Sequence, residues 1–460
     1  MTALRGAVAA LRVSPLIVIG LVAVALYLVV VGWAMGNASF DVWGALVVGP
    51  VLIAISLPIL WRLLRDEDDP RLVRLIFAAL VFKLVGSIIR YAVAFEVYGG
   101  LRDAGGYHDW GRTLAPMFRG GDFTADLGRG VIGTGFIEIV TGVVYVFTGA
   151  TQLGGFLVFS WLGFWGLYLF YRAFRIGFPN GDHFRYALLL FLLPSMLFWP
   201  SSTGKEAWMT LALGLTAYGC ARLLTQRRGG FSCFALGILA TTMARPHMSL
   251  IVFLAIAGAY LLRRSSKASV MSPAAKGFGI VALLVVGLLV VSQTETFLGV
   301  DRLDTGTVSN ELDENVERTD EAESTFEAKK VDSPIGMIGA TLAVLYRPWP
   351  TEAHSAQALF ASLEGMVLLV LTCLSVRRLA AVPREMFRTA YVALALMYTL
   401  LFVYGFASVG NFGNIARQRV QLFPMALVLL CVPARTWGKG AEDPDESSDR
   451  QPVMATPSRR

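Results

Sequence analysis

Long apolar runs recur along the whole chain and restrict its fold more than any other feature of the sequence. Of the 460 residues, 55% are hydrophobic and only 16% are charged. Many of the runs approach the roughly 20 residues that an α-helix needs to cross a bilayer, where the backbone must satisfy its own hydrogen bonds. They predict an all-α fold class, a polytopic helical membrane bundle of about 12 transmembrane helices with two long extracytoplasmic loops.

The predicted spans follow one another almost from the N-terminus. They lie near 14–35, 43–62, 74–98, 152–171, 184–199, 205–222, 231–244, 248–262, 277–293, 356–376, 387–409 and 419–435. Residues 1–435 therefore form one predicted transmembrane domain, with outer loops at 99–151 and 294–355. The segment 436–460, rich in Gly, Asp, Ser and Pro, is predicted to be a disordered cytoplasmic tail.

Three apolar segments do not fit a simple span. Residues 131–148 contain Glu138 and several glycines, and 335–346 is too short to cross, so we expect both to be interfacial or re-entrant helices on the outer face. The run 231–262 is too long for one span and is interrupted by Arg245-Pro246-His247. Because each half is shorter than a bilayer requires, we expect this break to lie below the outer surface, beside a water-filled cavity.

The distribution of basic residues sets the orientation of this topology. With the N-terminus in the cytoplasm, every inside loop is basic, as the positive-inside rule requires. The cations of these loops are Arg62, Arg65, Arg71, Arg74, Arg172, Arg175, Arg185, Arg222, Arg227, Arg228, Arg263, Arg264, Lys267, Lys276, Arg377, Arg378, Arg384, Arg388, Arg435 and Lys439. The pattern predicts a multi-pass plasma-membrane protein with both termini in the cytoplasm, and no nucleic-acid partner is needed to explain the net charge of +7.

The same topology assigns the conspicuous polar motifs to one face, outside. These motifs are 103–109, 201–206, 245–247, 347–354 and 411–419. They bring together acids, the cations Lys205, Arg245, Arg347, Arg417 and Arg419, and the histidines His108 and His247. A polar cluster at the mouth of an apolar bundle suits a substrate with an anionic head and an apolar tail.

The stretch from Pro194 to Trp208 separates two apolar runs. Pro200 cannot continue the first helix, and Thr203 with Glu206 three residues later predicts a capping box for the second. A helix N-terminus that carries Lys205 favours binding of a phosphate or another anion. The alternative is that Glu206 only caps the helix while Lys205 extends to lipid head groups.

Other polar residues fall inside apolar runs. Lys83, Ser87 and Arg90 share a helical face, and buried charges are usually paired, so we expect Glu364 to pair with Lys83 or Arg90. The four cysteines also lie in or beside apolar runs, without metal-like spacing. They predict neither a disulfide framework nor a zinc site.

The order of the polar motifs resembles that of the GT-C superfamily of integral-membrane glycosyltransferases, which use polyprenyl-phosphate-linked sugars. The segment from Asp103 to His108 is similar to the acid-plus-tyrosine segment that follows an early span in those enzymes. The motifs at 198–206, 245–247, 347–350 and 411–419 together resemble a bacterial polysaccharide-biosynthesis branch. One departure is that Asp103 has no adjacent second acid, so a divalent metal is not supported and no cofactor is expected to be required.

The resemblance implies a chemical role for each of these residues. Asp103 would take the proton of the acceptor hydroxyl, and Arg417 and Arg419, with Arg245 or Lys205, would hold the departing phosphate. Tyr107 would stack on a sugar, or else anchor the membrane interface; His108 and His247 would assist, or else be structural. The remaining residues of the predicted substrate-binding set are Asp109, Glu206 and Arg347.

The implied function is transfer of a sugar from a polyprenyl-phosphate-linked donor to a cell-envelope or exopolysaccharide acceptor on the outer face. Its partners would be that donor, a glycan or lipid-linked acceptor, and the bilayer itself. Two alternatives remain open: a polysaccharide repeat-unit polymerase, and a lipid-linked sugar flippase or transporter. The embedded charges Lys83, Arg90, Glu96 and Glu364 keep the transporter open, because proton-coupled transport uses similar residues.

Overall fold

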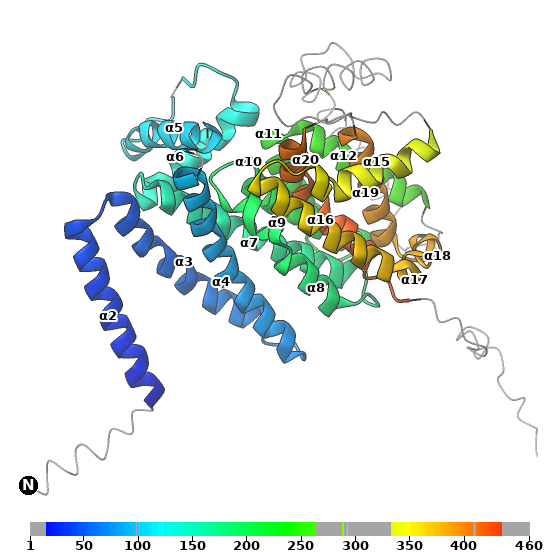
Figure 1. Cartoon of the computed structure of the whole chain (residues 1–460), viewed down its shortest axis with the longest axis horizontal. Coiled ribbons are helices and arrows are strands. Elements are labelled where there is room, and N and C mark those ends of the chain that lie inside the picture. Colours follow the sequence, from blue (N-terminus) through cyan, green and yellow to red (C-terminus); the bar gives the residue numbers. More distant parts are fainter. Residues whose placement is uncertain are drawn as a thin grey trace, which may run out of the picture.

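Helices dominate the computed structural model, which describes residues 15–97, 99–100, 102–124, 126–262, 288, 292, 333–407 and 411–434 (Figure 1). The predicted span 277–293, the acidic segment 294–332 and the predicted tail 436–460 lie outside these residues, apart from positions 288 and 292. The helical fold class is confirmed for the part that is described.

The α-helices have the following bounds. They are α2 (Pro15–Asn37), α3 (Phe40–Leu64), α4 (Pro70–Ala92), α5 (Arg102–Arg119), α6 (Phe136–Thr148), α7 (Gln152–Gly177), α8 (His183–Leu192), α9 (Pro194–Phe198), α10 (Lys205–Leu224), α11 (Gly230–Ala244), α12 (Pro246–Leu262), α15 (Pro334–Tyr346), α16 (Ala356–Leu374), α17 (Val376–Leu379), α18 (Val382–Arg388), α19 (Ala390–Phe406), α20 (Phe412–Gln418) and α21 (Phe423–Leu429). The π-helical turn η1 (Val93–Val97) extends α4, and a second π-helical turn, η2 (Val131–Gly135), precedes α6.

Seven described helices are long and apolar enough to cross a membrane, and the bent pair formed by α8 with Pro194–Ser201 would make eight. Four shorter apolar helices, Gly230–Ala244, Pro246–Ala259, Ile335–Tyr346 and Ala390–Phe406, accompany them. The chain is therefore a helical membrane protein, while the count of 12 spans stays a prediction. Val131–Thr148 is among the seven, because η2 lengthens α6 to 18 residues, although the backbone is non-helical at Ile132 and Gly133.

The long run 231–262 is divided as predicted. α11 ends at Ala244 and α12 begins at Pro246, with Arg245 between them in a non-helical conformation. Arg245 is only 6% exposed, so this break is buried among neighbouring segments.

Glycines let the central helices α7, α10 and α11 approach closely. A Cβ atom added at Gly214 of α10 would lie 2.3 Å from the carbonyl oxygen of Gly166 in α7. On another face of α10, a Cβ atom at Gly237 of α11 would lie 2.5 Å from the backbone nitrogen of Thr216. Small residues at helix crossings are a common way for membrane helices to pack, because dispersion contacts replace the hydrophobic effect in lipid.

This crossing gives a prediction about stability. We expect Gly214→Ala to lower the melting temperature of the detergent-purified protein, since the added carbon must displace backbone and overpacking costs about 1–3 kcal/mol. The matched control is Gly32→Ala in α2, where a Cβ atom would meet nothing within 4 Å. Equal melting temperatures for the two variants would show that the α7–α10 crossing is not tight.

The predicted cytoplasmic loops meet one another at one end of the bundle. Arg175 at the end of α7 forms an ion pair with Glu67, in the turn between α3 and α4. Asp182, before α8, pairs with Arg378 at 3.0 Å and donates its backbone N–H to the carbonyl oxygen of Cys431. Three loops far apart in sequence thus share one end, as the distribution of basic residues predicts. Which side of the membrane this end faces stays a prediction.

The helix break between α8 and α10 is held by two buried charged residues. Lys83 of α4, 1% exposed, donates from Nζ to the carbonyl oxygen of Met196 (2.7 Å) and to Oγ of Ser201 (2.9 Å). Glu364 of α16 accepts hydrogen bonds from the backbone N–H and hydroxyl of Ser195. The predicted pairing of Glu364 with Lys83 or Arg90 is therefore wrong. The helix break leaves backbone groups and serine hydroxyls that hydrogen-bond Lys83 and Glu364 separately. Arg90 instead stacks on the ring of Phe198.

Candidate functional site

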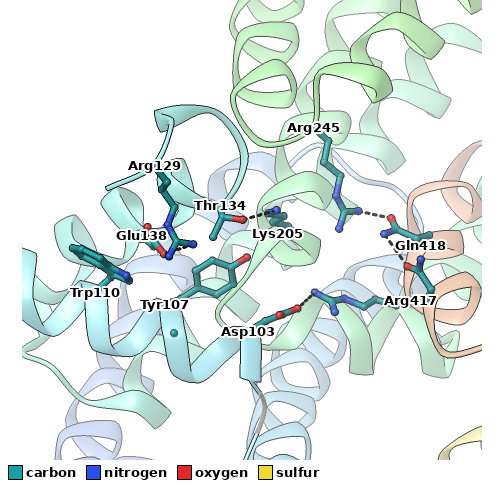
Figure 2. A pocket seen from close by; sticks show the side chains of 12 residues that line it. Asp103, Tyr107, Trp110, Arg129, Thr134, Glu138, Lys205, Arg245, Arg417 and Gln418 are labelled. Atoms are coloured by element: carbon teal, nitrogen blue, oxygen red, sulfur yellow. Dashed lines mark hydrogen bonds and ion pairs between the residues drawn. The ribbon is translucent and has the colours of Figure 1, made fainter. Parts of the chain in front are cut away.

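A cavity of about 380 Å³ opens at the end of the bundle opposite the contacting basic loops. Segments from four parts of the chain line it: α5, the region from Arg129 to α6, the adjoining ends of α10 and α11, and α20 (Figure 2). The lining residues are Asp103, Gly106, Tyr107, Trp110, Arg129, Thr134, Glu138, Lys205, Arg245, Asn414, Arg417 and Gln418.

Helix α5 forms one wall of the cavity. Asp103, Gly106, Tyr107 and Trp110 follow a spacing of three and four residues, which puts them on one helical face. The opposite face packs on α6, where a Cβ atom at Gly111 would lie 2.6 Å from Cγ2 of Thr141. The sequence predicted an outer loop here because glycines and polar residues predominate. Packing of the amphipathic helix against α6 outweighs the low helix propensity of those residues.

The predicted capping box at the start of α10 is wrong. The helix begins at Lys205, its N-cap is Gly204, and no side chain accepts a hydrogen bond there. The hydroxyl of Thr203 is buried and has no hydrogen-bond partner in the described part of the chain. Both carboxylate oxygens of Glu206 are instead taken by arginines from other segments, so they are not available to the backbone at the N-cap.

Glu206 lies at the centre of a charged network beneath the cavity. The residue is 3% exposed, and its carboxylate accepts two hydrogen bonds from Arg417, from Nε at 2.7 Å and from Nη2 at 3.2 Å. Arg245 approaches the same carboxylate with Nη2 at 2.8 Å. Arg417 also reaches Oδ2 of Asp103 at 2.8 Å, which links α5 to α20. One buried acid therefore orients two arginines that line the cavity.

Gln418 holds the second arginine from its other side. Its side-chain oxygen accepts from Nη1 of Arg245 and from Nε2 of Gln421, the latter at 2.7 Å. Its amide nitrogen donates to Oδ1 of Asn414 at 3.2 Å. The guanidinium of Arg245 is thus fixed between Glu206 and Gln418, with both partners hydrogen-bonded in turn.

Lys205 differs from the arginines in its contacts. Its ammonium donates to Oγ1 of Thr134 at 3.0 Å. Within the described part of the chain it forms no ion pair with a carboxylate, whereas Arg129, Arg245 and Arg417 each do. Lys205 is therefore the cavity cation whose charge is least neutralised by its neighbours.

The opposite wall of the cavity contains residues that the sequence did not single out as site residues. Glu138 of α6 lies 3.5 Å from Nη1 of Arg129, and Trp110 borders the same side (Figure 2). The one available signal was the presence of an acid, Glu138, inside an otherwise apolar run. No cluster of three or more His, Cys, Asp or Glu suited to a metal ion occurs among the described residues.

The charge states of two lining residues follow from their neighbours. The Glu206 carboxylate raises the pKa of the Arg417 guanidinium, and Asp103 adds to the rise, so this cation persists at any physiological pH. Burial raises the pKa of the Tyr107 phenol, and the carboxylates of Glu206 and Asp103 act in the same direction. Tyr107 is therefore neutral at physiological pH and able to donate a hydrogen bond.

Other predicted site residues do not line the cavity. His108 faces α6, where its Nδ1 and the hydroxyl of Tyr145 form a hydrogen bond of 2.8 Å. Burial lowers the pKa of the His108 imidazole, so this ring is neutral at pH 7. Asp109 is exposed on another face of α5. His247 lies beside Phe406 on the far side of the α11–α12 break. These residues stay predictions, without a place in the cavity wall.

The two remaining predicted cations contact other parts of the protein and do not line the cavity. Arg419 is 0% exposed and donates to the carbonyl oxygens of Arg347 (2.8 Å), Leu345 (3.3 Å) and Ala361 (3.3 Å). Arg347 itself forms an ion pair with Glu352 and lies over the ring of Phe412. Both connect the segment after α15 to the segment around α20, and so support the cavity indirectly.

These observations define a class: a helical membrane protein with a charged cavity at one end of its bundle. Comparison of the chain with protein-family models, with curated proteins and with solved structures found no match.

Proposed function

We propose that this chain is a membrane glycosyltransferase that moves a sugar from a polyprenyl-phosphate-linked donor to a cell-envelope or exopolysaccharide acceptor at the outer face of the plasma membrane. The observation that carries the proposal is that two acids, Asp103 and Glu138, and four cations line a single cavity at one end of an apolar bundle; the cations are Arg129, Lys205, Arg245 and Arg417. The resemblance of the motifs to GT-C enzymes supports the same reading.

The proposed reaction needs a base and a site for a leaving phosphate. The acceptor oxygen forms a bond to the anomeric carbon of the sugar, and its proton passes to the Asp103 carboxylate. The bond between that carbon and the phosphate oxygen breaks, and the electron pair stays on the phosphate. Cations fixed before the reaction stabilise the charge that develops there without costly reorganisation.

The ion pair between Asp103 and Arg417 gives this reaction an order of events. Nη2 of Arg417 is shared between Asp103 and Glu206. A phosphate that enters beside Lys205 competes with Asp103 for this guanidinium. Because Glu206 still holds Arg417 from behind, the Asp103 carboxylate becomes free to accept a proton.

The apolar bundle accounts for the lipid part of the proposed donor. Helices of the bundle expose large apolar side chains. A polyprenyl tail can therefore remain in the bilayer beside them while its phosphate enters the cavity. Neither Lys83 nor Glu364 needs a transported ion to explain its burial, because each hydrogen-bonds the helix break. Two of the four embedded charges that keep a transporter open thus have a structural role.

Turnover by the purified protein tests the proposal. In lipid nanodiscs, the wild-type chain should release free lipid phosphate from at least one member of a panel of short-chain polyprenyl-phosphate sugars, when cell-envelope glycan acceptor is present. Mass spectrometry of the lipid measures the release. Consumption of lipid-pyrophosphate-linked oligosaccharides with growth of a polymer would instead identify a repeat-unit polymerase. Movement of intact lipid-linked sugar between leaflets would identify a flippase.

The outer location of the cavity predicts which positions an impermeant thiol reagent can reach. In a chain whose four cysteines are replaced by alanine, new cysteines at the exposed positions Asp122 and Asn414 should be labelled in intact cells. Cysteines at Asp68 and Ala380, near the opposite end, should be labelled only after lysis. Labelling of 68 and 380 in intact cells would place the cavity in the cytoplasm and contradict the proposed acceptors.

A further inference from the structure

Glu138 is a buried acid with unused hydrogen-bonding capacity in the wall of the cavity. Its side chain is 2% exposed, and it lines the cavity. One carboxylate oxygen, Oε1, lies 3.5 Å from Nη1 of Arg129, while Oε2 is buried without a hydrogen-bond partner among the described residues. A buried acceptor without a partner is costly, so a group that supplies a proton donor to Oε2 is favoured at this position.

The surroundings of Glu138 differ from those of the cationic side. Figure 2 shows Trp110, Arg129 and Glu138 on one side of Tyr107, and Arg245, Arg417 and Gln418 on the other, with Lys205 between them. The Glu138 side offers an aromatic ring, a carboxylate and a guanidinium, a set that recognises hydroxyl groups and the apolar face of a pyranose. The other side is dominated by cations, which recognise phosphate.

Resting on the proposed function, we propose that Glu138, Arg129 and Trp110 form a subsite that binds the hydroxyl groups of the donor sugar, next to a phosphate subsite formed by Lys205, Arg245 and Arg417. Oε2 of Glu138 accepts a hydrogen bond from one sugar hydroxyl. Trp110 packs against the ring, and Arg129 orients the carboxylate through their ion pair.

The connection through Thr134 supports this division of the cavity. Its hydroxyl accepts from Lys205 at 3.0 Å, and Thr134 lies in η2, one helical turn before Glu138. The phosphate and sugar subsites are thereby adjacent, as the glycosidic bond of the donor requires. A phosphate on the Glu138 side would face an uncompensated carboxylate oxygen, whereas a sugar hydroxyl satisfies it.

Binding measurements with and without the sugar test this subsite. The probes are farnesyl phosphate and a panel of farnesyl phosphates linked to glucose, galactose, mannose, N-acetylglucosamine or arabinose, added to the protein in nanodiscs. At least one glycosylated probe should bind the wild-type chain more tightly than farnesyl phosphate alone. Glu138→Gln should weaken that probe by about 10- to 100-fold, the value of a hydrogen bond to a charged group. The affinity of the Glu138→Gln variant for farnesyl phosphate should stay within about twofold of the wild-type affinity, because the variant loses only the contact with the sugar.

Two further variants keep the test decisive. Trp110→Ala removes the ring from a half-buried position and should reduce the preference for the glycosylated probe over farnesyl phosphate. This variant tests the subsite if Glu138→Gln does not fold. Asp122→Asn, an exposed carboxylate just after α5 and outside the cavity lining, is the matched control and should leave every affinity unchanged. Equal binding of all probes by the wild-type chain, or a preference that survives both Glu138→Gln and Trp110→Ala, would overturn the subsite. Failure of the wild-type chain to bind farnesyl phosphate and every glycosylated probe would overturn the proposed function as well.

Discussion

Replacing Asp103 by Asn should reduce sugar transfer by about 100- to 10,000-fold, the usual contribution of a general base. Asparagine has nearly the same shape, and its side-chain oxygen still accepts the hydrogen bond from Arg417 that Asp103 accepts at 2.8 Å. The amide cannot take a proton at neutral pH, so the chemical step should suffer while the melting temperature and donor affinity stay close to those of the wild type. Single-turnover transfer rates at saturating donor measure the effect.

An exposed acid just after the same helix provides the control for this prediction. Asp122→Asn changes a carboxylate that lies outside the cavity lining, and it should leave transfer within about twofold, as expected for a group without a catalytic role. A rate for Asp103→Asn within about threefold of the wild type would remove Asp103 as the base. Glu138 would then be the remaining acid of the described cavity lining, and the assignment of roles would have to change.

Replacing Arg417 by Lys should cost most of the affinity for the lipid phosphate. Lysine keeps the charge but cannot hold Glu206 through two nitrogens while a third contact reaches Asp103 or a ligand. The loss of one hydrogen bond to a charged partner is worth about 1.5–3 kcal/mol, so we expect binding of farnesyl phosphate to weaken by about 10- to 100-fold. Isothermal titration against the protein in nanodiscs measures it.

Two other arginines separate a binding role from a structural one. Arg112→Lys, an exposed position on α5 outside the cavity lining, should leave the affinity unchanged. Arg419→Lys should instead lower the yield of folded protein, because Arg419 is fully buried and holds three backbone carbonyl oxygens. Full affinity in Arg417→Lys would move the phosphate site to Lys205 and Arg245 alone.

The features that could be predicted from the sequence are those determined by composition and local pattern. Apolar runs of sufficient length predict membrane helices because lipid allows few other conformations. The division of the run 231–262 followed from its length and from the Arg-Pro-His interruption, and the structure confirms it. The common end of the basic loops followed from their spacing between helices, and contacts such as Arg378–Asp182 agree with it.

The features that could not be predicted depend on tertiary contacts. The helix α5 is stabilised by its packing on α6 at Gly111, a contact that local glycine content does not reveal. Glu206 and Thr203 have the spacing of a capping box, but Arg245 and Arg417 come from segments distant in sequence and take the carboxylate. Arg417 and Arg419 are two residues apart in sequence, yet one lines the cavity and the other is buried against backbone.

The lipids of a deletion strain test the central claim, sugar transfer from a polyprenyl-phosphate donor through Asp103, most directly. Deleting the gene should cause one glycosylated polyprenyl phosphate to accumulate, as measured by mass spectrometry of extracted lipids. The wild-type gene should restore the normal level, Asp122→Asn should do the same, and Asp103→Asn should not. An unchanged pool of every glycosylated polyprenyl phosphate, or full restoration by Asp103→Asn, would contradict this account.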